Sequence, residues 1–337
     1  MKILITGATG FLGSHLTQRL IKNGFEVNCL VRKTYSKEKV KELEKLGAEI
    51  SYGDVTNVET LNVLPTDIDV VYHLAALIDH TLSSYAPYHQ TNVVGVKNLI
   101  DRMLDSGVQK FIFTSSIAAI GLVKTETGLV DEKAECKPIT FYGKSKLEAE
   151  KLLCHYFEEF KFPVVTMRLP PIYGPGGKNG FLDTAKFIER KIYDNKPVFY
   201  VGKGDVLTSL CYVDNAVDAL LLAMKTEYVG ELFHVDDGKP YTSKEVLTTI
   251  YDVLGKKPPE IYVPKTILSI IAYANELINK TLRFRLGNLS REKLETLSTN
   301  LAFDISKARK YLGYNPKRDF ETFVRKTIDW YIKNGLL

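Results

Sequence analysis

A tyrosine and a lysine four residues apart, Tyr142 and Lys146, are the side chains whose types and spacing point most directly to proton chemistry. They open the stretch from Tyr142 to Phe160, whose apolar periodicity predicts a helix, and residues four apart share one face of a helix. A free phenol has a pKa of about 10, and a nearby ammonium lowers it by stabilising the phenolate. The spacing therefore predicts that Tyr142 exchanges a proton with a substrate hydroxyl, with Lys146 beside it.

Two serines could complete this group. Ser115 and Ser116 end an apolar run that begins at Lys110 and reads as a buried strand. A hydroxyl at the end of such a strand can hydrogen-bond a substrate oxygen. The residues alone do not show which of the two serines contacts the substrate.

The elements that must position these groups begin with the first residues of the sequence. The apolar run from Lys2 to Thr6 predicts a buried strand, Gly7, Gly10 and Gly13 follow it, and helical periodicity then begins. Strand, glycine turn and helix form the layout that binds a dinucleotide pyrophosphate, because the backbone can approach the phosphates and the helix N-terminus faces the anion. The alternative is an ordinary strand-to-helix turn with incidental glycines.

Strands and helices alternate along the first half of the chain, which predicts an α/β fold with a doubly wound parallel sheet of Rossmann type. The further strands expected are Glu26–Val31, Ala48–Tyr52, Val70–Leu74, Lys110–Ser115 and Val164–Arg168, and the helices are Lys37–Lys45, Val94–Ser106 and Tyr142–Phe160. Residues 1–170, together with about 210–237, are predicted to form the dinucleotide-binding domain. Residues 171–209 and 238–337 are predicted to form a smaller, mostly helical substrate lobe.

The end of the second strand indicates the type of dinucleotide. An NAD site usually has an acidic residue there, which accepts hydrogen bonds from the ribose 2′-hydroxyl. Here Val31 occupies that place, and Arg32 and Lys33 follow it. A guanidinium can bind a 2′-phosphate through two hydrogen bonds, so the sequence favours NADP (NADPH), with NAD as an alternative cofactor. Two solvated cations at a strand end are the other interpretation.

Several segments of the sequence, in the same order, resemble the extended branch of the short-chain dehydrogenase/reductase superfamily, the NAD-dependent epimerases and dehydratases. They are TGATGFLG (6–13), GDV (53–55), HLAAL (73–77), TNVVGVKNLI (91–100), FTSSIAAIG (113–121) and YGKSK (142–146). The resemblance implies an enzyme with a Rossmann fold and a set of residues against the cofactor. With the two cations above, the predicted cofactor-binding residues are Gly7, Thr9, Gly10, Phe11, Leu12, Gly13, Arg32, Lys33, Asp54, Val55, Leu74, Ala75, Ala76, Asn92, Thr114, Tyr142, Lys146, Pro170 and Ile172.

The same resemblance assigns roles to the reactive group. Alignment with the family's serine loop selects Ser116 as the residue that hydrogen-bonds the substrate oxygen, with Ser115 as the runner-up. Tyr142 is the implied acid/base, and Lys146 also holds the nicotinamide ribose. Hydride then moves to or from the nicotinamide, whose positive charge further lowers the pKa of the Tyr142 phenol. His73 is expected to be structural, and Asn92 is expected to brace the active-site loop.

Two departures from the family pattern indicate the class of substrate. Nucleotide-sugar epimerases and dehydratases usually have an asparagine where this sequence has Pro171, and an arginine where it has Thr208. A diphosphate substrate would lose both contacts. The segment Phe303–Pro316 instead resembles 3β-hydroxysteroid dehydrogenases and dihydroflavonol reductases, which favours an oxidoreductase acting between a secondary alcohol and a ketone on a largely apolar molecule. Residues of the lobe could line its cavity or form plain helix core: Phe181, Ile270, Ile271 and Tyr273.

Two alternatives to this function stay open. A nucleotide-sugar epimerase or dehydratase would need another diphosphate clamp, such as Arg283 or Arg285. A non-catalytic NADP-binding regulatory protein would keep the glycine turn, but such proteins typically lose the Tyr-x-x-x-Lys pair.

Composition limits the other classes of function. The net charge of +5 on 337 residues comes with no nucleic-acid motif, and six histidines and four scattered cysteines show no metal-ligand spacing, so no metal is expected. The sequence shows no signal peptide and no apolar run long enough to span a bilayer, which predicts a cytoplasmic protein with a small-molecule substrate.

The longest apolar stretch, Thr266–Ile278, is expected to be a core or cavity helix, with a membrane-surface role as the alternative. The helices from Val94 and from Tyr142 carry apolar positions beyond those that one sheet face needs, for example Leu152, Leu153, Tyr156 and Phe157. Two such helices from each subunit form the dimer interface in the family, so the resemblance implies a homodimer.

Overall fold

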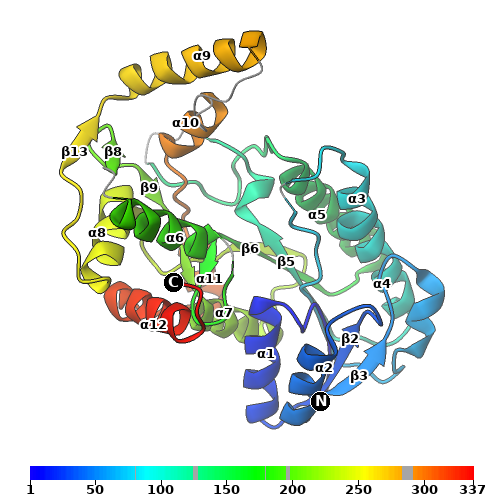
Figure 1. Ribbon diagram of the computed structural model, residues 1–337. Coiled ribbons are helices and arrows are strands. Elements are labelled where there is room, and N and C mark those ends of the chain that lie inside the picture. Colours follow the sequence, from blue (N-terminus) through cyan, green and yellow to red (C-terminus); the bar gives the residue numbers. More distant parts are fainter. Residues whose placement is uncertain (80, 124–127, 179, 195–197, 283–290) are drawn as a thin grey trace.

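A seven-stranded sheet in which every strand pair is parallel forms the centre of the molecule (Figure 1). The computed structural model describes residues 1–79, 81–123, 128–178, 180–194, 198–282 and 291–337. The strands follow the order β11-β6-β5-β4-β1-β2-β3. Their bounds are β1 Lys2–Thr6, β2 Glu26–Val31, β3 Glu49–Tyr52, β4 Val70–His73, β5 Lys110–Ser116, β6 Val164–Leu169 and β11 Glu231–His234. This confirms the predicted doubly wound Rossmann sheet, with bounds shifted by one residue at some ends.

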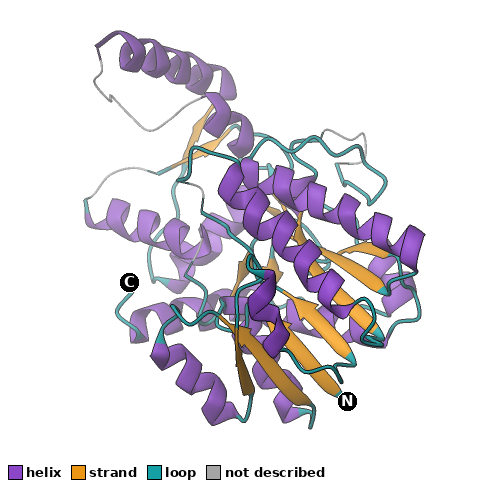
Figure 2. Ribbon diagram, turned by 90° about the vertical axis from the view of Figure 1, so that its right-hand side faces the viewer, coloured by secondary structure: helices purple, strands orange, loops and turns teal. Residues whose placement is uncertain are grey.

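Helices cover both faces of the sheet (Figure 2), which explains why β1 is an unbroken apolar run. Ile3 and Ile5 face the core beneath α1 (Phe11–Lys22), α2 (Lys37–Leu46) and α7 (Val213–Lys225), whereas Leu4 faces the opposite core. The second layer consists of α4 (Gly95–Met103) and α5 (Phe141–Phe160). Helical turns before α4 extend the predicted helix backwards: α3 Ala86–His89 and η2 Gln90–Val94.

The remaining elements are short strand pairs and helices, mostly after Leu169. The strands are β7 Ile172–Tyr173 with β10 Cys211–Tyr212, β8 Phe199–Val201 with β13 Ile261–Val263, and β9 Leu207–Thr208 with β12 Tyr241–Thr242. The helices are η1 Val58–Val63, η3 Ile117–Ala119, α6 Gly180–Tyr193, α8 Ser243–Val253, α9 Lys265–Leu282, α10 Arg291–Leu297, α11 Ser306–Leu312 and α12 Phe320–Lys333. The C-terminal region is therefore mostly helical, as expected. The exact division into two domains stays a prediction.

The predicted cavity residues of the C-terminal region do not share one environment. Phe181 is buried in the core and stacks on Tyr173. Ile270, Ile271 and Tyr273 are exposed on α9, so they do not form helix core, and their assignment to a cavity lining stays a prediction. The reason is that α9 packs on α10 through one side only. None of the helices among the described residues combines the length and the hydropathy that a transmembrane span requires.

Candidate active site

The turn between β1 and α1 depends on its three glycines. Gly7 has a φ of +77°, and a Cβ there would lie 2.7 Å from the backbone nitrogen of Ala75. A Cβ on Gly13 would lie 2.1 Å from the carbonyl oxygen of Gly7, which no side chain permits. Gly10 caps α1 and donates its N–H to Gly7. The N-terminus of α1 is therefore held against the carboxyl edge of the sheet, next to the point where strand order reverses between β1 and β4.

The segment after β4 is anchored beside this turn by three residues. The Thr6 hydroxyl contacts Nδ1 of His73 at 2.8 Å and accepts the N–H of Ala75 at 3.2 Å. The Asn92 amide accepts from the Leu77 N–H and donates to the Leu77 carbonyl. His73 is fully buried, and burial lowers its pKa to about 3, so its ring is neutral and packs between aromatic residues.

Asn92 also ties this segment to the helix of the reactive pair, because its amide donates to the Ser145 hydroxyl at 2.8 Å. Ser145 in turn donates to the Tyr142 carbonyl in the first turn of α5. This arrangement places Asn92 as a brace between two segments of the site.

Ser116, Tyr142 and Lys146 come together at the end of β5 and the start of α5. The side chain of Ser116 hydrogen-bonds the Tyr142 phenol and accepts the N–H of Ala118 at 3.1 Å. The Lys146 ammonium donates to the Thr114 carbonyl at 2.7 Å and lies 5.9 Å from the centroid of the Tyr142 ring. Ser115, the alternative serine, points to Glu150 instead. This geometry favours Ser116 over Ser115 as the partner of Tyr142.

Burial shifts the pKa values of both members of the pair in the protein without cofactor. Burial raises the pKa of Tyr142 to about 12, although the hydrogen bond from Ser116 opposes the shift. Burial also lowers the pKa of Lys146 to about 7, against the attraction of Glu150. The protein alone therefore does not lower the pKa of the phenol, because the nearby ammonium is itself desolvated and turned toward Thr114.

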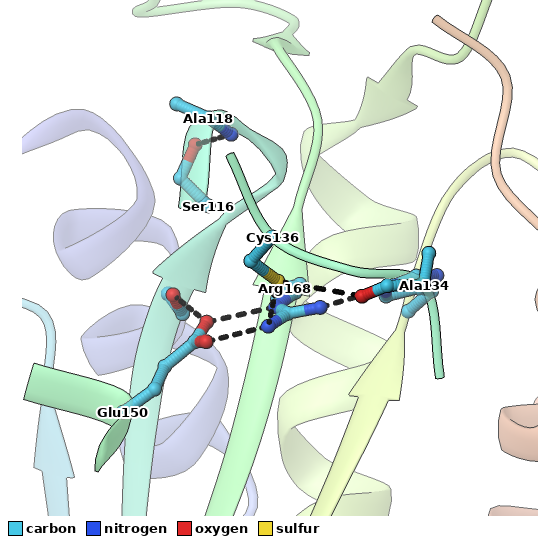
Figure 3. Close-up of polar contacts among 8 residues, drawn as sticks. Ser116, Ala118, Ala134, Cys136, Glu150 and Arg168 are labelled. Carbon is cyan, nitrogen blue, oxygen red and sulfur yellow. Dashed lines mark hydrogen bonds and ion pairs between the residues drawn. The ribbon is translucent and has the colours of Figure 1, made fainter. Parts of the chain in front are cut away.

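A buried ion pair beneath the reactive group was not predicted from the sequence. Glu150 lies one helical turn beyond Lys146 and meets Arg168 of β6, with Nε–Oε1 and Nη2–Oε2 distances of 2.8 and 2.6 Å (Figure 3). The two side chains are only 7% and 4% exposed. Ser115 donates to Glu150, and Arg168 donates to the Cys136 sulfur at 3.2 Å. The spacing of four from Lys146 could have revealed Glu150, whereas nothing in the sequence indicated its partner.

The cations expected for the cofactor's ribose follow β2. Arg32 and Lys33 are exposed there, beside a hollow of about 380 Å³. Its lining includes four cations and one carboxylate: Arg32, Lys33, Tyr35, Lys37, Val40, Lys41, Glu44 and Tyr52. A further cation, Lys39, reaches the glycine turn and donates to the Thr9 carbonyl at 3.0 Å. No motif pointed to Lys39.

The remaining predicted residues lie around the same edge of the sheet. Asp54 follows β3 and accepts both the N–H and the hydroxyl of Thr56. Val55 is buried beneath Gly95. Pro170 and Ile172 follow β6, and Ile172 begins β7. Arg283 and Arg285, the alternative diphosphate clamp, lie outside the described residues.

These features fit a bound dinucleotide. The glycine turn leaves a space that a side chain would fill, the α1 N-terminus faces it, and cations stand at one end of the carboxyl edge. Tyr142 and Lys146 stand at the end of β5, on the other side of β1 and β4. The order along the edge is the one a dinucleotide requires, from adenosine ribose through phosphates to the reacting group.

The relatives found by comparison with known proteins include both oxidoreductases and a nucleotide-sugar epimerase. The chain is 28% identical to 4-hydroxy-2-methyl-3-oxo-4-farnesyl-3,4-dihydroquinoline-1-oxide ketoreductase of Stigmatella aurantiaca, covering 93% of this chain and 92% of that protein. It is 28% identical to UDP-glucose 4-epimerase of Vibrio cholerae (98% and 95% covered). It is 26% identical to 3-beta-hydroxysteroid dehydrogenase of Mycolicibacterium neoaurum (98% and 91% covered).

The fold and the family are likewise confirmed. The crystal structure of gox2253 superposes with a TM-score of 0.81 at 26% identity, covering 99% of both chains. The model of the NAD-dependent epimerase/dehydratase family matches residues 3–235, which is more than half of the sequence. The chain therefore belongs to the NAD-dependent epimerase/dehydratase family, whose members include oxidoreductases, epimerases and dehydratases.

Proposed function

We propose that the protein is an NADPH-preferring oxidoreductase that interconverts a secondary alcohol and a ketone on a largely apolar small molecule. The observation that carries the proposal is the Ser116–Tyr142 hydrogen bond beside buried Lys146, at the same sheet edge as the glycine turn. A regulatory protein without catalysis would have no need of this group.

The mechanism assigns one task to each residue. Ser116 holds the substrate oxygen, and Tyr142 transfers the proton to or from it. Since the pKa of Tyr142 is raised to about 12, the phenol is protonated at neutral pH and is ready to act as the acid in ketone reduction. Lys146 fixes the first turns of α5 against Thr114. It would also hold the nicotinamide ribose of a bound cofactor. When bound, the nicotinamide supplies or accepts the hydride.

The substrate class follows from what the lobe offers and from the relatives. Pro171 and Thr208 stand where diphosphate-binding enzymes usually have an asparagine and an arginine, and Thr208 lies in β9, paired with Tyr241. Two relatives are named for a farnesylated ketone and for steroids, which supports an apolar substrate. Nucleotide-sugar epimerisation is the second candidate, because a relative of equal identity is a UDP-glucose 4-epimerase.

We also propose that the protein is a cytoplasmic homodimer. Free thiols at all four cysteines support a reducing compartment. The exposed faces of α4 and α5 are the proposed dimer surface, although Leu153 and Tyr156 pack inside the subunit and only Leu152 and Phe157 remain half-buried.

Replacing Tyr142 with phenylalanine tests the proposed chemistry. Tyr142→Phe removes the proton donor and keeps the ring, so we expect NADPH affinity to be unchanged and ketone reduction to fall at least ~100-fold. Steady-state kinetics on an apolar ketone measure the loss, and fluorescence titration measures the affinity. Turnover equal to that of the unmodified enzyme would remove Tyr142 as the acid.

Removing the charge of Glu150 tests the buried pair as a positioning device. The carboxylate raises the pKa of Lys146, so Glu150→Gln should lower that pKa further below about 7. Because the ammonium form is lost as pH rises through this pKa, the decline of kcat/KM toward high pH should move to lower pH. The matched control is Glu148→Gln, a half-buried carboxylate on the same helix. Identical pH profiles for the two variants, both folded by circular dichroism, would contradict this role.

Arg32 tests the preference between cofactors. A hydrogen bond to a charged group contributes about 1.5–3 kcal/mol, so NADPH should bind at least tenfold tighter than NADH. Arg32→Ala should remove most of this difference by weakening NADPH alone, whereas Lys45→Ala, outside the hollow, should not. Calorimetric titration of NADPH and NADH into each protein measures this difference in affinity. Equal affinities in the unmodified protein would show that the Arg32 guanidinium does not meet a 2′-phosphate.

A further inference from the structure

Within residues 265–275 of helix α9, several large apolar side chains lie on the side that faces away from the protein. Leu268 and Ala272 are one turn apart and pack on Leu294 of α10. Ile270 lies midway between them in sequence, so at 3.6 residues per turn it points to the opposite side. It is 70% exposed, and Tyr273 is 58% exposed. A surface helix normally has the reverse distribution, with polar residues outward.

The apolar outer face, defined here as Ile267, Ile270, Ile271 and Tyr273 of α9 with Leu297 of α10, is a projecting surface. All five side chains are exposed. In both views α9 and α10 stand at the end of the molecule away from the N-terminal strands (Figures 1 and 2). An exposed group of large apolar side chains on a projecting helix indicates a contact surface.

The charge of the chain is concentrated in the same half. Residues 171–209 and 238–337 contain 24 lysines and arginines against 14 aspartates and glutamates, whereas the remaining residues contain 21 against 26. The half that carries the apolar outer face therefore has a formal charge of +10, and the other half has −5. A net positive charge on these segments favours an anionic partner.

Aromatic rings and cations are paired on and near the apolar outer face. The Arg291 guanidinium lies 5.6 Å from the centroid of the Tyr273 ring. The Lys244 ammonium lies 5.6 Å from the centroid of Tyr262 on β13, the strand that leads into α9. Exposed aliphatic residues together with tyrosines and cations are the composition of helices that lie in a membrane interface, where rings sit at the headgroup level and cations meet lipid phosphates.

We propose that the apolar outer face docks the protein on the surface of an anionic lipid bilayer, with α9 lying in the interface. The isoleucines enter the boundary of the acyl chains, and the cations of the lobe face the headgroups. This inference does not rest on the proposed function, since it uses no residue of the reactive group. Two other occupants fit this face less well. Nucleic acid would leave the outward isoleucines without apolar contacts, and a second copy would bring two positively charged lobes together.

Vesicle flotation tests the proposal without a substrate. The probes are vesicles of phosphatidylcholine alone and of phosphatidylcholine with about one-third phosphatidylglycerol. We expect flotation with the anionic vesicles, much less with the neutral ones, and loss at high salt. Ile270→Glu should weaken binding at least ~10-fold, since it replaces inserted methylenes with a charge. The matched control is Ile332→Glu on α12, an isoleucine of the same half that is 53% exposed, which should float like the unmodified protein.

Three results would overturn the proposal. They are no flotation with anionic vesicles at low salt, equal flotation of the two variants, and a fall in solution mass from two chains to one in Ile270→Glu by light scattering. The last result would make a second copy the occupant of the face. Unchanged NADPH binding in Ile270→Glu shows that the variant is folded, so a loss of flotation is read as loss of the surface alone.

Discussion

The close approach of α1 to the sheet edge is the constraint on which the proposed site depends. The Gly7 carbonyl lies where a Cβ of Gly13 would have to be, and the Ala75 backbone lies where a Cβ of Gly7 would be. Any side chain at either position would push the helix or the 73–77 segment outward. The same approach places the N-terminus of α1 at the switch point of the sheet, where the helix dipole meets an anion. The absence of a side chain at Gly7 and Gly13 therefore determines the shape of the site.

The position of the reactive group depends on a row of buried charged side chains of alternating sign. Lys146, Glu150 and Arg168 follow one another from α5 to β6, and each carboxylate oxygen of Glu150 receives a hydrogen bond from Arg168. An isolated buried charge costs several kcal/mol, whereas hydrogen-bonded partners offset most of that cost. The register of β5 and β6, in which Ser115 pairs with Arg168, brings these groups together. Parallel pairing of two buried strands thus determines where the Lys146 amine can be.

Much of the fold could be read from the sequence because its cause is local. β1 is apolar on both sides since both of its faces are covered, and the pair Tyr142 and Lys146 is visible from helical spacing alone. The Glu150–Arg168 pair was missed because it joins two elements whose register no local pattern specifies. The effect of burial, which raises the pKa of Tyr142 in the protein without cofactor, was not part of the sequence prediction, because depth of burial is a property of the packed molecule. For α9 the sequence left a core or cavity helix and a membrane-surface helix as alternatives, because an apolar stretch alone does not show which of its sides is packed.

A net redox reaction on an apolar molecule is the proposed chemistry of the site. The most direct measurement follows the absorbance of NADPH while the protein is incubated with a panel of apolar ketones, with UDP-glucose in parallel, and products are identified by mass spectrometry. We expect one NADPH to be oxidised for each alcohol formed and UDP-glucose to be unchanged. Conversion of UDP-glucose into its 4-epimer, with no net change in NADPH and no ketone reduced, would contradict it.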